Sequence, residues 1–233
     1  MKRRNSSKII CMDFYGLPGS GKSTISHLLA TKLRSYDHVF EPSYYYDHNC
    51  TKARRVILKT FGVLVLFISS SRMFVQVCKI LVECNLYPTS KAFYINLLNL
   101  AYKFNALNRK NNGVVIFDQG FLQSVISMYF RNHSINETII LKKYEKIKML
   151  IGKDVDIRNV YIKTDIDTVV GRLANRHTNV SRVQALDLAE MRKELAIQKS
   201  IFDIAPCSII VDSGDYTVTD CVGILLEKMN INK

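Results

Sequence analysis

The sequence predicts a three-layer α/β fold, in which a parallel sheet of about five strands carries helices on both faces. The main observation is that short apolar runs typical of buried strands alternate along the chain with amphipathic segments typical of helices. The second observation is that 48% of the 233 residues are hydrophobic, which is enough to bury one full core. We therefore expect residues 1–233 to form a single domain.

The most specific motif in the chain is the glycine-rich loop Gly16–Thr24. It fits the pattern G-x-x-x-x-G-K-[ST], with an apolar strand, 9–15, before it and a helix beginning at Lys22 after it. In this setting the backbone N–H groups of the loop converge on a polyphosphate at the positive end of the helix. The motif therefore predicts a P-loop NTPase fold that binds ATP.

The residue types in this loop predict separate roles. Lys22 is expected to reach the β- and γ-phosphates and to act in catalysis, and the hydroxyl of Ser23 is expected to bind Mg²⁺. The loop residues predicted to bind the nucleotide are Gly16, Gly19, Ser20, Gly21, Lys22, Ser23 and Thr24.

Composition narrows the range of partners. The net charge of +13 favours an anionic partner, such as a polyphosphate, a nucleic acid or an acidic membrane surface. Because Lys and Arg are spread along the whole chain and no segment has the spacing of a nucleic-acid module, nucleic acid is disfavoured. The six cysteines form no C-x-x-C pair, which indicates free thiols in a reducing compartment. We expect a cytoplasmic protein.

A second strand is predicted at 37–42, ended by Pro42. This places the carboxylate of Glu41 at the carboxyl edge of the sheet, where open α/β sheets bind ligands. Tyr44 lies in the aromatic loop that follows. The tyrosine ring is predicted either to stack on a flat substrate that accepts a phosphoryl group or to cover the core with its hydroxyl in water.

The segment 56–82 is strongly apolar. Only 12 uncharged residues separate Lys59 from Arg72, which is too short for a membrane span. Three interpretations remain: helices buried in the core or in a homodimer interface, the walls of an apolar acceptor pocket, or a surface for peripheral membrane contact. Basic residues just before the segment keep the membrane interpretation open, namely Lys52, Arg54, Arg55 and Lys59.

A long helix is predicted at 93–107, followed by a buried strand at 114–117 that Asp118 ends. This arrangement is typical of a Walker B element, in which Asp118 holds Mg²⁺ beside Ser23. The alternative is that Asp118 only caps the next helix, which runs from Gln119 towards residue 130.

The remaining chain continues the alternation of helices and strands, with strands at 157–162 and 208–212 and helices at 136–151, 183–202 and 217–229. Thr164 and Asp167 form a predicted capping pair for the helix that carries Arg172 and Arg176. These two arginines are four residues apart and therefore share one face, which is either functional or simply solvated. The polar stretch that follows has the character of a mobile flap.

Taken in order, the glycine loop, Glu41-Pro42, Asp118-Gln119-Gly120, the two arginines and the final strand's Asp212-Ser213 resemble the thymidylate kinase and deoxynucleoside kinase group of P-loop kinases. The resemblance implies that Glu41 is the general base. It also implies that 172–182 is a lid, in which Arg172 contacts the adenine and Arg176 the transferred phosphoryl group.

Two departures from the family pattern bear on the acceptor. Thr178 stands where a third lid arginine is expected, and Gln119 stands where the family usually has an arginine that helps to hold an acceptor's phosphate. Since Gln119 carries no charge, a neutral alcohol is favoured as acceptor.

The sequence thus predicts a kinase that transfers the γ-phosphoryl group of ATP to a hydroxyl of a nucleoside, nucleotide or related metabolite. Its predicted acceptor-binding residues are Glu41, Tyr44 and Gln119, within or beside a helical acceptor or dimer region at 52–107. The alternative is a P-loop ATPase or switch that acts on a partner or on a lipid-like acceptor at a membrane.

Overall fold

The computed structural model describes residues 9–35, 39–42, 50–83, 91–107, 113–129, 137–151, 155–176 and 182–229. Its centre is a five-stranded sheet in the order β2-β3-β1-β4-β5, with every pairing parallel. The strands are β1 (Ile9–Tyr15), β2 (Val39–Phe40), β3 (Val114–Phe117), β4 (Val155–Lys163) and β5 (Ile209–Asp212). This sheet confirms the predicted fold class.

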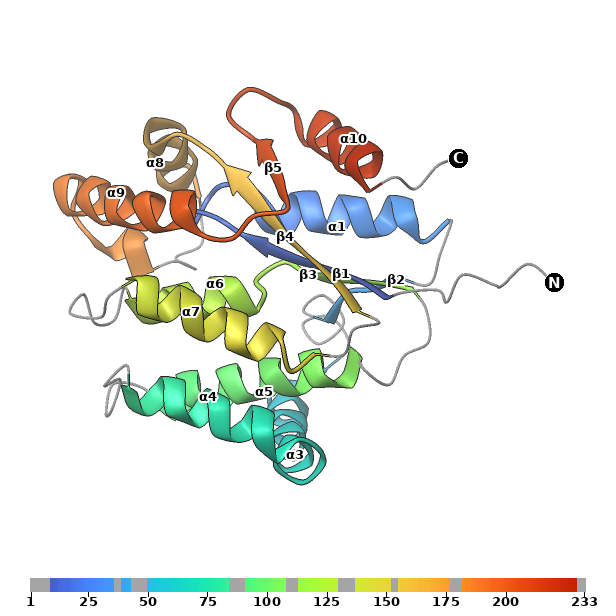
Figure 1. The fold of residues 1–233 in the computed structure, drawn as a ribbon. Coiled ribbons are helices and arrows are strands. Elements are labelled where there is room, and N and C mark those ends of the chain that lie inside the picture. Colours follow the sequence, from blue (N-terminus) through green and yellow to red (C-terminus); the bar gives the residue numbers. More distant parts are fainter. Residues whose placement is uncertain are drawn as a thin grey trace.

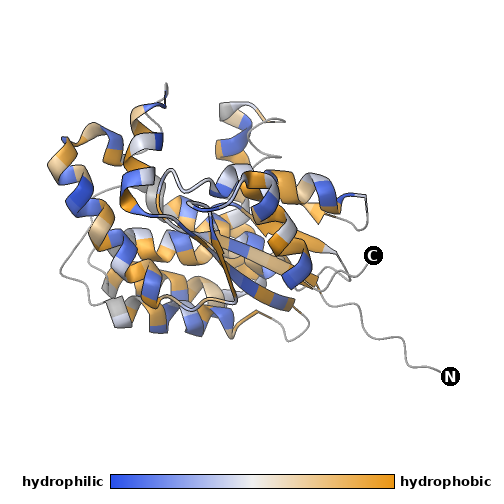
Figure 2. Cartoon of the chain, turned by 90° about the horizontal axis from the view of Figure 1, so that it is seen from above, coloured by the Kyte–Doolittle hydropathy of each residue, from blue (hydrophilic) through white to orange (hydrophobic). Residues whose placement is uncertain are grey.

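Helices cover both faces of the sheet (Figure 1). On one face, α1 (Lys22–Leu33) and α10 (Val218–Lys228) pack into one hydrophobic cluster with the strands. On the other face lie α5 (Lys91–Leu107), α6 (Phe121–Tyr129), α7 (Glu137–Lys148) and α9 (Leu188–Ile204). Along the strands, hydrophobic residues predominate, while the surrounding helices alternate between hydrophobic and hydrophilic residues (Figure 2).

Strand β1 shows how the alternation of side chains along a strand divides the core into two clusters, one on each face of the sheet. Met12 and Phe14 belong to the cluster under α1, whereas Cys11 and Tyr15 belong to the cluster on the other face, because successive side chains of a strand point to opposite faces. Asp13 lies between Cys11 and Tyr15 and therefore points toward the α6 face, where it is fully buried.

Two further helices, α3 (Lys52–Ser69) and α4 (Ser71–Glu83), form an outer layer that packs against α5, and α4 also contacts α7 (Figure 1). They contain the apolar segment 56–82. Core burial within one chain does not account for this segment, because much of the apolar surface of α3 is exposed. Among the described helices, none alone is long and apolar enough to cross a bilayer; α3 and α4 would meet that requirement only together, and they bend by 116° where they join.

Local geometry corrects two of the predicted helix starts. The N-cap of α8 (Ile166–Ala174) is Asp165, whose Oδ1 accepts a hydrogen bond from Thr168 N–H at 2.7 Å, so the predicted Thr164–Asp167 capping pair is wrong. Thr164 instead shares a hydrogen bond with Ser213 across two strand ends at 2.7 Å. The predicted helix 183–202 is divided into a short 3₁₀ helix, η1 (Arg182–Ala185), and α9.

Gly120 precedes α6 and approaches β1 closely. A Cβ atom at this position would overlap the carboxylate of Asp13, which is buried beneath it. By contrast, Gly223 lies on the exposed side of α10, and a Cβ there would have no neighbour within 4 Å.

We expect Gly120→Ala to lower the free energy of unfolding by about 1 to 3 kcal/mol, because a buried carboxylate cannot move aside without strain. The matched variant Gly223→Ala should raise it by roughly 0.5 to 1 kcal/mol, because alanine favours a helix interior. Urea unfolding followed by circular dichroism measures both changes. Equal stabilities of the two variants would contradict the close contact at Gly120.

Candidate active site

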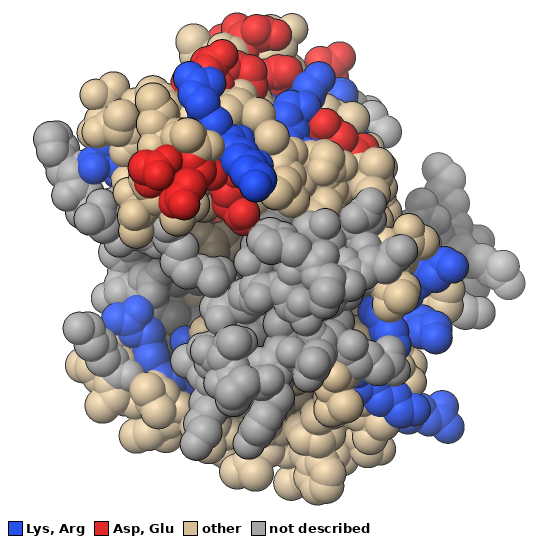
Figure 3. Space-filling model, turned by 90° about the vertical axis from the view of Figure 1, so that its left-hand side faces the viewer, with Lys and Arg blue, Asp and Glu red and all other residues tan. Residues whose placement is uncertain are grey.

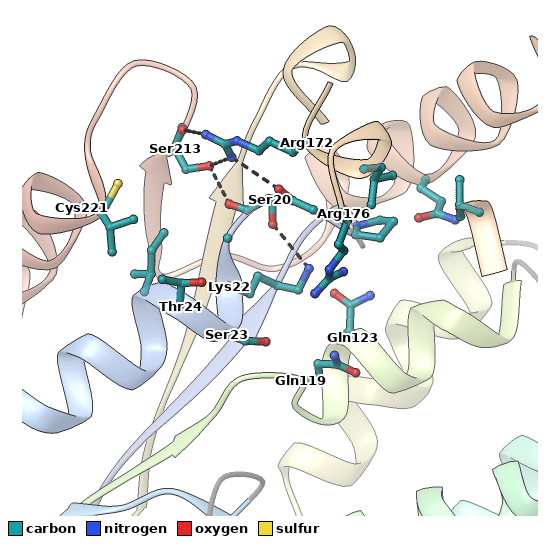
Figure 4. A pocket seen from close by; sticks show the side chains of 18 of the residues that line it. Ser20, Lys22, Ser23, Thr24, Gln119, Gln123, Arg172, Arg176, Ser213 and Cys221 are labelled. Carbon is teal, nitrogen blue, oxygen red and sulfur yellow. Dashed lines mark hydrogen bonds between the residues drawn. The ribbon is translucent and has the colours of Figure 1, made fainter. Parts of the chain in front are cut away.

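A cavity of about 660 Å³ opens beside the glycine loop at the carboxyl edge of the sheet. It is lined by this loop, by residues of α6 and α8, and by the turn that follows β5 (Figure 4). These segments are far apart in sequence, but each follows the end of a parallel strand or begins a helix beside it. The parallel sheet therefore gathers them at one edge.

The glycines of the loop adopt backbone angles that other residues avoid. Gly21, directly before α1, has a φ of 89°, in the left-handed region. Gly16 has a φ of 145°, and a Cβ atom there would lie 2.5 Å from the carbonyl oxygen of Ile162 in β4. The predicted loop geometry therefore depends on glycine for both its turn and its close packing on the sheet.

Lys22 lies inside this loop. Its Nζ donates hydrogen bonds to the carbonyl oxygens of Gly16 at 2.8 Å and Leu17 at 2.6 Å. Burial lowers the pKa of Lys22 to about 7; the nearby Asp118 carboxylate acts in the opposite direction, and Arg176 adds to the lowering. An anion bound at the loop would supply a negative charge beside this buried ammonium group and so favour its charged form.

Asp118 and Ser23 meet as the sequence predicts. Ser23 Oγ donates to Asp118 Oδ2 at 3.0 Å, although the two residues are 95 positions apart. Asp118 Oδ1 is buried and has no hydrogen-bond partner in the part of the chain that the structure describes. A hydroxyl beside an unpaired carboxylate oxygen fits the oxygen ligands that Mg²⁺ prefers. Metal binding by this pair stays a prediction.

The capping role considered for Asp118 belongs to another residue. The N–H of Leu122, in the first turn of α6, donates to Asp13 Oδ2 at 3.1 Å. Asp13 thus supports the start of α6 from a neighbouring strand, and sequence reasoning missed it because a cap is normally sought just before the helix. Burial raises the pKa of Asp13 to about 7, while hydrogen bonds from the Leu122 and Phe121 backbone lower it.

The two predicted lid arginines both line the cavity, in different surroundings. The guanidinium of Arg172 donates to the Ser213 carbonyl at 2.6 Å and, more weakly, to Ser213 Oγ at 3.3 Å and Gly19 O at 3.5 Å. Arg176 follows the end of α8 at Ala174, so the two are not on one helix. Its guanidinium lies beside Lys22 and Gln123 (Figure 4). The rest of the predicted lid, 177–181, is outside the described residues.

Two polar residues that sequence reasoning did not assign to the site are Gln123 and Ser213. Gln123, on α6, accepts a hydrogen bond from Gly16 N–H at 2.9 Å. Ser213 Oγ donates to Ser20 O at 2.7 Å. Ser213 follows β5, and the sequence indicated it only as part of a family motif. No sequence pattern indicates a role for Gln123, because its hydrogen-bond partner Gly16 is 107 residues away.

The predicted acceptor residues are placed unequally. Gln119 is exposed and lines the cavity, whereas Tyr44 lies outside the described residues. Glu41 is 5% exposed and does not occur among the described residues that line the cavity. Its carboxylate pairs with Arg34 at 3.2 Å and with His27 Nδ1 at 3.1 Å, both beside or within α1.

The charged side chains that line the described part of the cavity are all basic. Among its described lining residues, the charged side chains are Lys22, Arg172 and Arg176, and no Asp or Glu lines it. Such a surface attracts and holds anions, and the backbone N–H groups at the start of α1 add to the effect.

Comparison with known proteins supports the fold. No model of a protein family and no curated protein sequence matches the chain. Among solved structures, deoxyadenosine kinase from M. mycoides with bound dATP is similar, with a TM-score of 0.50 and 18% identity over 95% of this chain and 99% of that chain. Shikimate kinase from Bacteroides thetaiotaomicron aligns with a TM-score of 0.48 and 14% identity over 96% of this chain and 99% of that chain. The chain has the fold of the P-loop kinases.

The raised pKa of Asp13 leads to a test of its buried position. The folded state holds a proton on Asp13 over a pH range in which the unfolded chain has lost it, so stability falls as the pH rises from about 4 to about 7. Asp13→Asn removes this loss. Relative to wild type, the variant should gain about 1 kcal/mol or more in free energy of unfolding between about pH 5 and about pH 8. The exposed Asp215→Asn is the control, and a parallel profile for all three proteins would contradict the assignment.

Proposed function

We propose that the protein is an ATP-dependent phosphotransferase that moves the γ-phosphoryl group to a hydroxyl of a small molecule. The observation that carries this proposal is the cationic lining of the cavity around a complete phosphate loop. Lys22, Arg172 and Arg176 supply the charge, with no carboxylate among the described lining residues. A nucleoside triphosphate is the anion that such a loop and helix start are suited to bind.

The donor side has three tasks in this proposal. The loop N–H groups and Lys22 hold the β- and γ-phosphates, and Arg176, beside Lys22, stabilises charge on the transferred group. Arg172 is fixed by Ser213 at the opposite wall, which suits the contact with adenine that the family resemblance implies. Phosphoryl transfer needs mainly positioning and charge stabilisation, and these residues provide both.

Ser23 and Asp118 would hold Mg²⁺ in this reaction. When bound, the ion supplies positive charge to the β- and γ-phosphate oxygens. The hydrogen bond between Ser23 and Asp118 keeps the two ligands together in its absence.

The acceptor side is polar and uncharged. Three residues on or just before α6 line this part of the cavity, Gln119, Gln123 and Ser127. Amides and hydroxyls can bind the hydroxyl groups of a neutral molecule, but they offer no charge for an acceptor's own phosphate. We therefore propose a neutral alcohol as acceptor, with nucleosides as the first class to test because the similar M. mycoides enzyme is a deoxyadenosine kinase.

Glu41 is the proposed general base. His27, its partner, follows Ser23 by four residues on α1, so Glu41 lies about one helical turn from the proposed metal ligand. To accept a proton from the acceptor hydroxyl, its carboxylate has to turn from His27 and Arg34 toward the cavity.

The direct test is transfer from γ-labelled ATP and Mg²⁺ to a panel of nucleosides, nucleoside monophosphates, sugars and polyprenols. We expect labelled product with a neutral alcohol, and a loss of at least about 10²-fold in kcat for Lys22→Ala, because that lysine is the cation nearest the transferred phosphates. Lys142→Ala, an exposed lysine on α7, is the control. ATP turnover without product from any acceptor would favour the ATPase or switch instead.

Glu41 and its ion-pair partner can be separated by two variants. Glu41→Gln should keep ATP affinity and cut transfer by the roughly 10² to 10⁴ typical of a lost general base. Arg34→Gln breaks the same ion pair but keeps the carboxylate, so its transfer rate should stay within a few-fold of wild type. If both variants lose stability and activity alike, Glu41 only links β2 to α1.

A further inference from the structure

Helix α3 has one apolar face that the described structure leaves mostly exposed; its one described ring contact is between Phe67 and Phe74 of α4, with the ring centroids 5.1 Å apart. The opposite face of α3 packs on α5 through residues such as Gly62 and Leu66, both buried. The exposed face comprises Val56, Ile57, Phe61, Leu64, Phe67 and Ile68, with 64, 67, 59, 56, 55 and 82% of their surface exposed. At about 100° per residue these six lie within about 140° of the helix circumference. They form one continuous stripe, which we call the α3 stripe.

An exposed stripe of this size is unusual for a surface that faces only water. Single exposed apolar residues are common, but contiguous patches mark places that contact a protein or a membrane. Within the stripe's sector of the helix, the other exposed positions are Ala53 and Thr60, so no charge interrupts it. None of the described residues of α3 lines the ATP cavity, and the stripe is therefore separate from the proposed active site.

The charges around the α3 stripe are almost all positive. Residues 50–83 contain six basic residues and one acidic residue, Glu83. The basic residues are Lys52, Arg54, Arg55, Lys59, Arg72 and Lys79. On the face shown in Figure 3, Asp and Glu gather in the upper part, while the lower part shows basic and uncharged residues. In Figure 1 the helices α3, α4 and α5 form this lower end of the molecule.

This combination of charges favours a lipid partner over a second copy of the chain. Two copies joined through the α3 stripe would bring their basic residues together, and segment 50–82 has no acidic residue to pair with them. An anionic bilayer has the opposite charge at its surface and an apolar layer just beneath.

We propose that α3 lies flat on an anionic bilayer, with the α3 stripe at the boundary between headgroups and acyl chains and basic residues at its margins, such as Arg54 and Arg72, at the lipid phosphates. The helix has 18 residues and is about 27 Å long, so it can rest in the interface along its whole length. The 116° bend between α3 and α4 fits a helix that lies on the surface and does not cross it.

Vesicle sedimentation with the full chain tests this proposal. Wild type should pellet with vesicles of phosphatidylcholine and phosphatidylglycerol in equal parts, less so at high salt, and weakly with phosphatidylcholine alone. The double variant Leu64→Ser/Ile68→Ser should lose at least about tenfold in binding, because it removes two large side chains from the stripe. The control is Leu188→Ser/Ile204→Ser on α9, which removes side chains of comparable exposure, 57 and 55%.

A fluorescence experiment separates lipid contact from self-association. The chain contains no tryptophan, so Phe61→Trp introduces a single reporter on the stripe and Leu188→Trp a single control reporter on α9. The first should shift its emission to the blue on addition of the anionic vesicles, and the second should not. Neither should shift when the protein alone is concentrated.

Three results would overturn the proposal. These are wild type that stays in the supernatant with the anionic vesicles, a stripe variant that binds like the α9 control, and a dimer in solution that the stripe variant dissociates. The last would assign the stripe to a second copy. Because no readout uses catalysis, and Lys22→Ala should bind vesicles normally, these results are independent of the proposed function.

Discussion

The parallel pairing of β1 with both β3 and β4 is the constraint on which the candidate active-site cavity depends. Parallel strands end at the same edge, so the segments that follow β1, β3, β4 and β5 all emerge there. This arrangement brings Ser23 and Asp118 into hydrogen-bond contact and joins Arg172 to Ser213 elsewhere in the cavity wall. A shift of β1 by one residue would turn Asp13 away from α6 and Phe14 out of its cluster.

The cavity divides its chemistry between two walls. Charge is concentrated at the phosphate loop and at α8, where a triphosphate would bind, while the α6 wall presents Gln119 and Gln123. The start of α6 is held by Asp13, a buried carboxylate that favours its neutral form because burial raises its pKa. The position of the proposed acceptor wall therefore depends on Asp13, which is not among the described residues that line the cavity. The hydrogen bond from Gly16 to Gln123 joins the two walls directly.

The outer layer of α3 and α4 carries the exposed apolar α3 stripe, whereas the cavity is lined largely by polar and basic residues. This layer packs on α5 and α7, and none of its described residues lines the cavity beside the glycine loop. The proposed contact of α3 with an anionic bilayer would place the candidate active site on a membrane-bound molecule. Contact with lipid would then explain why apolar side chains of segment 56–82 are exposed, since a helix that belonged to the core would be covered on all sides.

The sequence by itself determined the five-stranded parallel sheet, the phosphate loop, and the meeting of Ser23 with Asp118. These features follow from local patterns, because glycine spacing and apolar periodicity act over a few residues. Only the tertiary structure decided that Asp13 caps α6, that Glu41 pairs with Arg34, and that the α3 stripe is exposed. Each of these depends on which residues distant in sequence become neighbours, or on which face of an apolar helix finds a partner, and no local pattern carries that information.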